Sequence, residues 1–461
     1  MFSADVAAVV LILLLVLVFS GIHVAVALGI TSAVGIYMVT GRESVVLALI
    51  QNTFYDAIRD YIFAVIPLFM LMGEFIGRSG ATSDLYVSLQ RSFRRIPGRL
   101  ALATLFGNAV FSFVTGVSIA SAATFTRIAY PEMKRHGYNR SFALGSIAGS
   151  GCLGMLIPPS VLMIVWGILT EQSIGKLFLA GVLPGLILVS FFAVYILVAA
   201  ILSPRLVGHS ADTLKAGTND DGISAVNLNP DEVDGEINSA SIWTSGLGLL
   251  ALIVTVLGGI WAGLFTPTEA AGMGALIALL LGIIKGMRWP DIYAGILAVG
   301  RTAAPLLILL IAAQLYSRTL TMTGVVSAIQ GFFSDAGLDP WQVIFVMVIV
   351  WFILGMIIDS VSIMLLTVPI FAPIAATIGI DPLTYALIGI LAIEAGILTP
   401  PFGLLVYTVK ASIPDMGDGE NVTLMDIFKG STPYWILMLA LIICMYAYPG
   451  IVTYLPKLVF G

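Results

Sequence analysis

Charged residues are scarce in this 461-residue chain. Asp, Glu, Lys and Arg together make up 10%, whereas a soluble domain carries about 25%. Hydrophobic residues make up 59%, enough for about ten membrane spans of about 20 residues each. The net charge of −5 is small and no basic stripe is present, which argues against a nucleic-acid partner. We therefore predict an all-α polytopic membrane protein in contact with a lipid bilayer.

Sequence motifs of enzymes are also missing. The chain has no Walker A, HExxH or GxSxG motif, and no Cys/His cluster with metal-ligand spacing, so neither nucleotide hydrolysis nor other catalysis is supported. The only two cysteines, Cys152 and Cys444, lie in apolar segments and are interpreted as small buried hydrophobes. The first apolar stretch, about 6–20, lacks a basic segment before it. It is predicted to be a retained span and not a cleaved signal peptide.

The chain contains the same motif twice. The segment Gly154-Met155-Leu156-Ile157-Pro158-Pro159 is followed 242 residues later by Gly396-Ile397-Leu398-Thr399-Pro400-Pro401, and the same register relates Ser118 to Ser360. A double proline removes backbone donors and interrupts α-helical geometry. In a membrane, such a break is tolerated only inside protein or beside a water-filled cavity. Paired broken helices in two halves indicate the binding site of a secondary transporter.

The register predicts two repeats, 1–202 and 242–461, joined by a polar cytoplasmic linker at 203–241. For the first repeat we predict spans near 4–20, 22–40 and 61–79, a connector near 82–98, an apolar region at 100–129, a broken helix at 141–168 and a span at 177–202. For the second we predict spans near 243–262, 266–285 and 302–322, a connector at 324–340, an apolar region at 341–374, a broken helix at 383–410 and a span at 432–449.

Charge predicts the orientation of the two apolar regions. Region 100–129 has clusters of arginine and lysine on both flanks, so it is expected to enter from the cytoplasm and return as a re-entrant hairpin. Region 341–374 has no Lys or Arg from Thr319 to Pro382 but is flanked by Asp335, Asp339 and Asp381. It is expected to enter from the periplasmic face. Two opposed re-entrant hairpins and two broken helices predict an inverted-repeat transporter fold.

Small and hydroxyl-bearing residues at the hairpin tips, with backbone carbonyls at the breaks, could surround a dehydrated monovalent cation. The predicted cation ligands are Thr115, Gly116, Ser118, Gly154, Ile157, Pro158, Asp359, Ser360, Ser362, Gly396, Thr399 and Pro400. Half-helix N-termini suit an anionic substrate, and the predicted substrate contacts are Ser121, Pro159, Ser160, Glu394 and Pro401. Small polar residues also mediate helix packing in membranes, and that alternative stays open.

Charges inside apolar segments are costly and usually functional. Asp359 could neutralise a cation or lie at an exposed turn, and Glu394 could contact substrate or only satisfy a neighbouring hydroxyl. Glu74 and Arg78 are expected to pair along one helix. Arg318 could meet a substrate carboxylate, although a position near the membrane interface is favoured.

Six segments resemble the DctM-type large membrane subunit of TRAP (tripartite ATP-independent periplasmic) transporters: 66–74, 130–138, 157–160, 265–271, 369–373 and 394–403. The resemblance covers nearly the whole chain. It implies an elevator transporter in the bacterial inner membrane, with Na⁺ as coupling ion and no other cofactor. It also implies an organic acid as substrate, a periplasmic substrate-binding protein of the DctP type, and a small four-helix membrane subunit of the DctQ type as a separate chain.

There are two alternatives to a TRAP permease subunit. A stand-alone Na⁺- or H⁺-coupled carboxylate symporter of the same architecture would work without partner subunits. A channel or structural scaffold would not need hairpins that enter from both faces. The sequence does not distinguish among sialic acid, dicarboxylates, keto acids and ectoine-like solutes as the substrate.

Overall fold

The computed structural model describes residues 4–208, 239–335, 337–414 and 422–461. Apart from one isolated bridge between Tyr138 and Val207, regular structure in these ranges is helical, which confirms the all-α prediction. Eight helices in the same ranges are long and apolar enough to cross a membrane. Most of the predicted linker at 203–241 lies outside the described residues.

The first half of the chain contains eleven α-helices in the described ranges. They are α1 (Ala4–Phe19), α2 (Val24–Thr40), α3 (Glu43–Arg59), α4 (Val65–Arg78), α5 (Ala81–Ser92), α6 (Arg99–Thr115), α7 (Ser118–Arg135), α8 (Arg140–Gly151), α9 (Leu153–Leu156), α10 (Val161–Thr170) and α11 (Ile174–Leu202). Short 3₁₀ turns, η1 (Tyr61–Ala64) and η2 (Pro204–Leu206), precede α4 and follow α11.

The described second half also contains eleven α-helices. They are α12 (Ser239–Ile253), α13 (Gly259–Trp261), α14 (Pro267–Ile284), α15 (Trp289–Thr323), α16 (Val325–Asp335), α17 (Pro340–Gly355), α18 (Ser360–Thr377), α19 (Pro382–Gly396), α20 (Leu404–Ala411), α21 (Leu424–Ala447) and α22 (Gly450–Phe460). A π-helical segment, η3 (Val254–Gly258), joins α12 to α13.

Four of these helices differ from the sequence prediction, among them α21, which begins eight residues before its predicted span at 432–449. Helix α15 has 35 residues, and the predicted span at 302–322 is only its second part. Helices α3 and α22 were not predicted at all. Helix α3 is amphipathic, with Thr53 and Ala57 buried and Tyr55 and Ile58 exposed, and a search for uniformly apolar spans overlooks such a helix.

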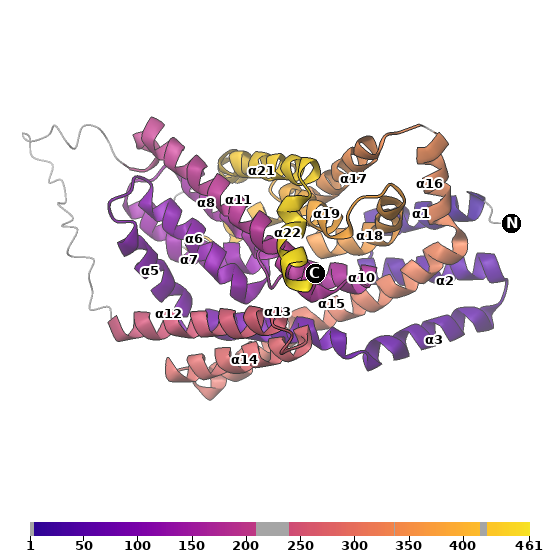
Figure 1. Cartoon of the computed structure of the whole chain (residues 1–461), viewed down its shortest axis with the longest axis horizontal. Coiled ribbons are helices and arrows are strands. Elements are labelled where there is room, and N and C mark those ends of the chain that lie inside the picture. The colour runs from indigo at the N-terminus through magenta and orange to yellow at the C-terminus, as the bar shows by residue number, and fades with distance from the viewer. Residues whose placement is uncertain (1–3, 209–238, 336, 415–421) are drawn as a thin grey trace, which may run out of the picture.

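Each apolar region forms a helical hairpin, α6–α7 in the first half and α17–α18 in the second, on opposite sides of the molecule in Figure 1. At the base of the first hairpin, a guanidinium nitrogen of Arg99 lies 3.1 Å from His136 Nε2. The carbonyl of Leu206, just after α11, accepts from the backbone of Asn139, just before α8. The base of the second hairpin instead lies beside the end of α10, where Ile380 and Thr170 line one cavity. The two bases therefore lie at opposite ends of the first broken helix.

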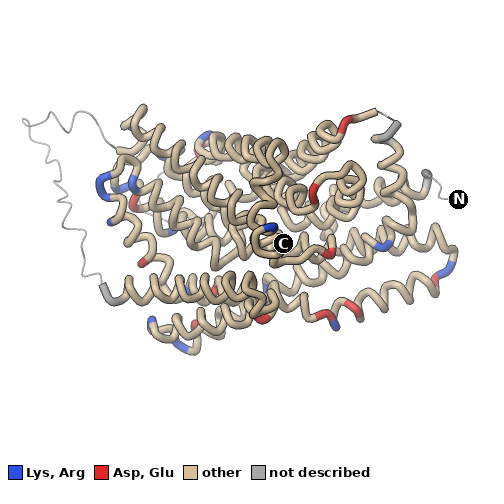
Figure 2. The backbone as a smooth tube through the Cα atoms, viewed as in Figure 1, with Lys and Arg blue, Asp and Glu red and all other residues tan. Residues whose placement is uncertain are grey.

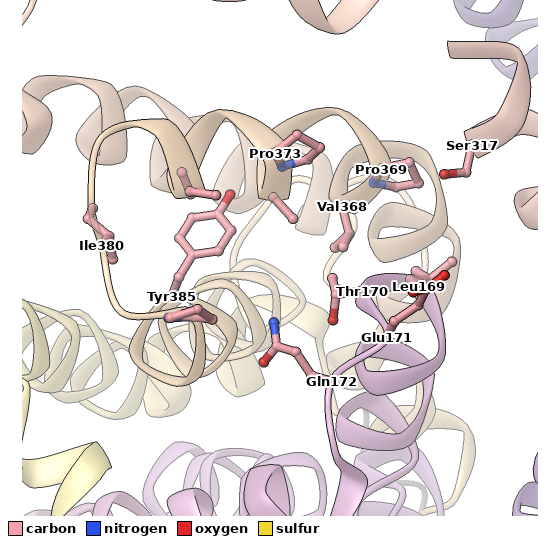
Figure 3. A pocket seen from close by; sticks show the side chains of 14 residues that line it. Leu169, Thr170, Glu171, Gln172, Ser317, Val368, Pro369, Pro373, Ile380 and Tyr385 are labelled. Atoms are coloured by element: carbon pink, nitrogen blue, oxygen red, sulfur yellow. The ribbon is translucent and has the colours of Figure 1, made fainter. Parts of the chain in front are cut away.

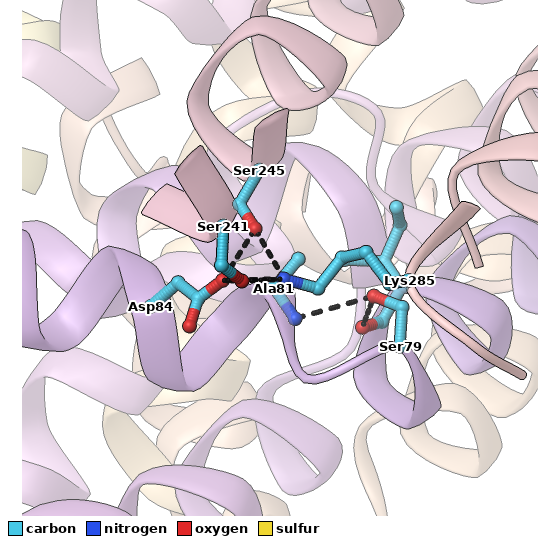
Figure 4. Close-up of polar contacts among 7 residues, drawn as sticks. Ser79, Ala81, Asp84, Ser241, Ser245 and Lys285 are labelled. Atoms are coloured by element: carbon cyan, nitrogen blue, oxygen red, sulfur yellow. Dashed lines mark hydrogen bonds and ion pairs between the residues drawn. The ribbon is translucent and has the colours of Figure 1, made fainter. Parts of the chain in front are cut away.

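Lys and Arg gather where α5 leads into α6, at the first hairpin base (Figure 2). A second charged group joins distant parts of the chain (Figure 4). Lys285, at the end of α14, donates to Asp84 of α5, and the hydroxyls of Ser241 and Ser245 on α12 donate to the same carboxylate at 2.8 and 2.7 Å. The side chain of Lys285 is only 9% exposed. This cluster fixes connector α5 to two helices of the second half.

Candidate functional site

The tip of the first hairpin sits directly on the first helix break. Gly116 turns the chain between α6 and α7 with φ +60°, and its carbonyl accepts from the backbone N–H of Val161 at 3.1 Å. A Cβ at position 116 would lie 2.5 Å from the carbonyl oxygen of Pro159. Only glycine fits this left-handed and closely packed position. Thr115 and Ser118 border the turn, and both are buried.

The first break comprises residues 157–160, between α9 and α10, and all four are buried. Ser160 caps α10: its hydroxyl accepts from the N–H of Met163 at 3.4 Å and donates to the carbonyl of Met155 at 2.6 Å. Gly154 approaches the hairpin tip, since a Cβ there would lie 2.9 Å from the carbonyl carbon of Val117. The predicted contact between the first tip and its own broken helix is thus present.

The second hairpin repeats this arrangement. Helix α17 ends at Gly355, and a Cβ on Gly355 would lie 2.7 Å from the Cα of Gly396, at the end of α19. The carbonyl of Met356 accepts from the N–H of Gly403 at 3.3 Å. Gly403 follows Val161, the donor in the first repeat, by 242 residues, whereas the acceptor Met356 follows Gly116 by 240. A similar backbone contact, shifted by two residues at the acceptor, therefore holds each tip to its break.

The second break, residues 397–403, is more open than the first. Thr399 is buried and its hydroxyl donates to the carbonyl of Gly396 at 2.6 Å. Pro400 and Pro401 are exposed, as is Phe402, which corresponds in register to Ser160. The peptide bond between the two prolines is cis in both breaks.

Glu394 joins the two hairpin tips. The hydroxyl of Ser118 donates to its Oε2 at 2.5 Å, and the hydroxyl of Ser360 donates to its Oε1 at 2.7 Å. Glu394 lies on α19 and is 0% exposed. Neither of its oxygens pairs with a Lys, Arg or His among the residues that the structure describes. The two serines that the register relates therefore meet at one buried carboxylate.

The other predicted residues occupy the rims of this centre. Ser121 lies in the first turn of α7, with its hydroxyl 3.2 Å from that of Thr115. Asp359 caps α18, because its Oδ1 accepts from the N–H of Ser362 at 3.0 Å. This cap satisfies a helix N-terminus and leaves the carboxylate at the partly exposed tip.

Two charged pairs lie outside the centre. Arg78 donates to Glu74 at 2.6 Å along α4, as predicted. Arg318 donates to Thr53 and Asp56 of α3 at 3.0 and 3.2 Å. In this structure, the guanidinium of Arg318 is therefore engaged away from the hairpin tips.

The centre offers oxygen atoms of two kinds. Serine and threonine hydroxyls have lone pairs beyond those used in hydrogen bonds, and the breaks present carbonyls with incomplete helical bonding. Such neutral oxygens suit a dehydrated monovalent cation. In the described part of the chain, no group of three His, Cys, Asp or Glu side chains could hold a metal ion.

A cavity of about 400 Å³ lies between the end of α10 and the base of the second hairpin. Figure 3 shows Thr170 and Gln172 on one side and Pro369, Pro373 and Tyr385 on the other. Ser317 of α15 completes the lining. Sequence reasoning did not find this cavity because its wall consists of residues from three separate segments.

Cys152 is buried, as predicted, but sequence reasoning did not predict that its Sγ lies 3.7 Å from the carbonyl oxygen of Glu394. The two residues are 242 positions apart, so they correspond in the two repeats. The register of the double prolines, applied to Glu394, is the signal that could have paired them.

The sequence matches the family described as "Tripartite ATP-independent periplasmic transporter, DctM component" over residues 11–451. It is 31% identical to the C4-dicarboxylate TRAP transporter large permease protein DctM of Pseudomonas aeruginosa, a match that covers 87% of this chain and 86% of the relative. It is 27% identical to the ectoine TRAP transporter large permease protein TeaC of Halomonas elongata, with 95% and 96% covered. It is 26% identical to the sialic acid TRAP transporter large permease protein SiaM of Vibrio cholerae, with 88% of each chain covered.

The fold is similar to two solved transporter structures. The YdaH transporter of Alcanivorax borkumensis aligns with a TM-score of 0.59 and 14% identity, over 84% of this chain and 86% of the other. MtrF of Neisseria gonorrhoeae aligns with a TM-score of 0.56 and 13% identity, over 87% and 84%. At these identities the similarity concerns the fold alone.

Proposed function

This chain belongs to the DctM family of TRAP transporter large permeases, and we propose that it imports an organic acid together with Na⁺ by an elevator mechanism. The family confirms the resemblance found in the sequence and makes the chain a transporter subunit and not an enzyme. The single observation that carries the Na⁺ proposal is the convergence of both hairpin tips, each seated on its own helix break, at Glu394.

The substrate class follows from the relatives. Their names give C4-dicarboxylate, ectoine and sialic acid as cargo, and all three compounds carry a carboxylate. An anion of this kind needs positive charge nearby, and Na⁺ bound at the tips would supply it. We assign the same general substrate class to this chain.

The coupling ion would bind where neutral oxygens converge. Each tip carries a buried serine and lies against a helix break that contains carbonyls, and the equivalent residues Val161 and Gly403 of the two breaks each donate to a carbonyl of the tip. Two related cation sites are the natural outcome of this arrangement. Each site would close only when its tip is seated on its break.

The elevator proposal rests on the division of the helices into two groups. Helices α1, α2, α4, α14 and α15 pack on one another, while the hairpins pack with the broken helices and α21. Figure 1 shows α2, α3, α12, α14 and α15 along one side of the molecule, with the hairpins above them. Connectors α5 and α16 link the two groups in sequence. The second group would move and carry the site past the first.

The partners and location come from the family. TRAP large permeases work with a small membrane subunit and a periplasmic substrate-binding protein, and we assign both to this chain, in a bacterial inner membrane. The cavity between α10 and α18 lies at the end expected to face the periplasm. Its position suits the side on which substrate is delivered.

Proteoliposomes test this function. Vesicles with this chain, its small subunit and its binding protein should accumulate the acid only with an inward Na⁺ gradient. With two Na⁺ per monocarboxylate, one net positive charge enters, and 100 mV of interior-negative potential adds about 2.3 kcal/mol per charge, a factor of about 50 in accumulation. Uptake driven by a pH gradient and indifferent to Na⁺ would refute Na⁺ coupling. Strong uptake by the lone chain would favour the stand-alone symporter.

A further inference from the structure

Glu394 lies where a substrate contact was predicted, but both of its oxygens already accept hydrogen bonds from the two tips. The carboxylate is fully buried, and in the described chain no cation pairs with it. Burying a carboxylate is costly unless it is hydrogen-bonded or neutralised. The position of this costly buried carboxylate between both hairpin tips therefore indicates that Glu394 has a functional role.

We propose that Glu394 is the positioning residue that prepares the hydroxyls of Ser118 and Ser360 as ligands for the coupling cations. This inference rests on the proposed Na⁺-coupled function. It assigns Glu394 to the cations, and not to the substrate.

The hydrogen-bond inventory of serine supports this assignment. A serine hydroxyl has one proton to donate and two lone pairs. At both tips that proton goes to Glu394, so the oxygen turns its lone pairs away from the carboxylate and is left as an acceptor. A cation requires such an oxygen. Groups that hydrogen-bond to a metal ligand orient it and increase its basicity, and their loss typically weakens metal affinity about 10–100-fold.

One carboxylate serves both sites, so it also links them. When a cation at the first tip orders the hydrogen bond between Ser118 and Oε2, the orientation of Oε1 toward Ser360 is also restricted, because both oxygens belong to one planar carboxylate. Binding of the first cation therefore favours the geometry for the second. The corresponding position in the first repeat is Cys152, a buried core residue whose thiol lies 3.7 Å from the backbone carbonyl of Glu394 and has no carboxylate to offer the serines. The link is provided by the second repeat alone.

The experiment measures initial uptake against Na⁺ concentration at saturating substrate in the reconstituted complex. Glu394→Gln keeps the size of the side chain but replaces one acceptor oxygen with an NH₂ donor, so one of the two serines must accept a hydrogen bond at this position instead of donating one. We expect the half-saturating Na⁺ concentration to rise about 10–100-fold and the Hill coefficient to fall towards one. Glu74→Gln, the same substitution at a carboxylate of α4 that lies outside the centre, is the control and should leave both values unchanged.

A second measurement covers variants that transport too poorly to analyse. Na⁺ should raise the melting temperature of the purified wild-type complex in detergent, and Glu394→Gln should require about 10–100-fold more Na⁺ for the same increase. Ser118→Ala and Ser360→Ala should each shift this Na⁺ dependence, and adding either to Glu394→Gln should produce less than the sum of the separate effects.

The outcomes separate this inference from the proposed function. A wild-type complex that takes up substrate without Na⁺ contradicts the function itself. A Na⁺-dependent wild type together with a Glu394→Gln variant of unchanged Na⁺ half-saturation, whatever its maximal rate, overturns only the role of Glu394. An effect of Glu394→Gln on the half-saturating substrate concentration alone also overturns it and restores the substrate contact.

Discussion

The two helix breaks share a motif but differ in exposure. Residues 157–160 are buried, whereas Phe402, the counterpart of Ser160, is 55% exposed. Helix α11 covers the first break: a Cβ at Gly181 would lie 2.8 Å from the carbonyl oxygen of Leu156. In the second repeat, α21 also contacts the break, because the hydroxyl of Ser431 donates to the carbonyl of Leu398 at 3.3 Å. This contact leaves Phe402 exposed, so the same motif is buried in one repeat and partly exposed in the other.

This asymmetry has a functional consequence. A transporter must not open its site to both sides at once, and identical repeats would open or close together. Here the same helix break is buried in one half and partly exposed in the other.

The largest effect is expected from closing the space between a tip and its break. Gly116→Val places a branched side chain at φ +60° and against the carbonyl of Pro159, and the left-handed conformation alone costs about 1–2 kcal/mol. In Gly355→Val, the new Cβ would lie 2.7 Å from the Cα of Gly396. We expect both variants to lose Na⁺-driven uptake, measured in proteoliposomes. Gly77→Ala on α4, with nothing within 4 Å of the new Cβ, is the control. Activity retained by either valine variant would show that its tip need not be seated.

The opposite placement of the hairpin bases predicts an all-or-none difference in labelling. Arg94, before the first hairpin, should face the cytoplasm and Asp381, after the second, the periplasm. With single cysteines at these positions in a background without Cys152 and Cys444, an impermeant maleimide added to spheroplasts should label position 381 only. Labelling of position 94 from outside, with intact vesicles as a check on sidedness, contradicts the inverted arrangement.

A graded difference is expected between the two breaks themselves. In the same background, Phe402→Cys should react with a small maleimide faster than Ser160→Cys. The ratio should be at least about tenfold, which corresponds to about 1.4 kcal/mol for exposing the buried position. Equal rates in the absence of Na⁺ and substrate would show that the sealed and open breaks do not differ in solution.

The smallest effect concerns the connectors. Asp84 anchors α5, whereas the corresponding residue of α16 is Val326. Partial burial opposes ionisation of Asp84, but hydrogen bonds from Lys285, Ser245 and Ser241 outweigh it and lower the pKa. The stabilisation is therefore fully present above the ordinary pKa of about 4 and is lost as pH falls through the lowered value.

Asp84→Asn should accordingly destabilise the protein by at most about 1 kcal/mol at neutral pH, because the pair is partly exposed. Thermal unfolding in detergent between pH 3 and 8 measures this difference. It should be constant above about pH 5 and shrink in more acidic solution. A difference that grows as the pH is lowered would contradict the assigned role of the Asp84 charge. Val326→Thr serves as the control in the other connector.

Much of the architecture was predictable because double prolines and long apolar segments leave strong signals. The predicted hairpin at 100–129 corresponds to α6 and α7, and the broken helix at 383–410 to α19 and α20. The first half of α15 was missed because Asp291 and Arg301 interrupt its apolar pattern. Helix α3 was missed because its amphipathic pattern contains no continuous apolar segment.

The individual residues of the site could be predicted from the sequence, but the convergence of two serine hydroxyls on Glu394 could not. The 242-residue register identified Ser118 and Ser360 as equivalent and therefore suggested two separate sites. It could not indicate that both hydroxyls meet Glu394, because that contact breaks the symmetry: the equivalent residue is Cys152. Convergence of segments 276 and 34 residues apart depends on tertiary packing, which a repeat pattern does not contain.

Equilibrium binding of radioactive Na⁺ to the purified permease, without substrate or binding protein, tests the central claim most directly. We expect saturable binding of two ions per chain for the wild type. Ser118→Leu with Ser360→Leu, which removes both hydroxyls and fills the space, should abolish it, while the control Gly77→Ala retains it. Equal saturable binding by the wild type and the double variant would contradict the assignment of the cation sites to the hairpin tips.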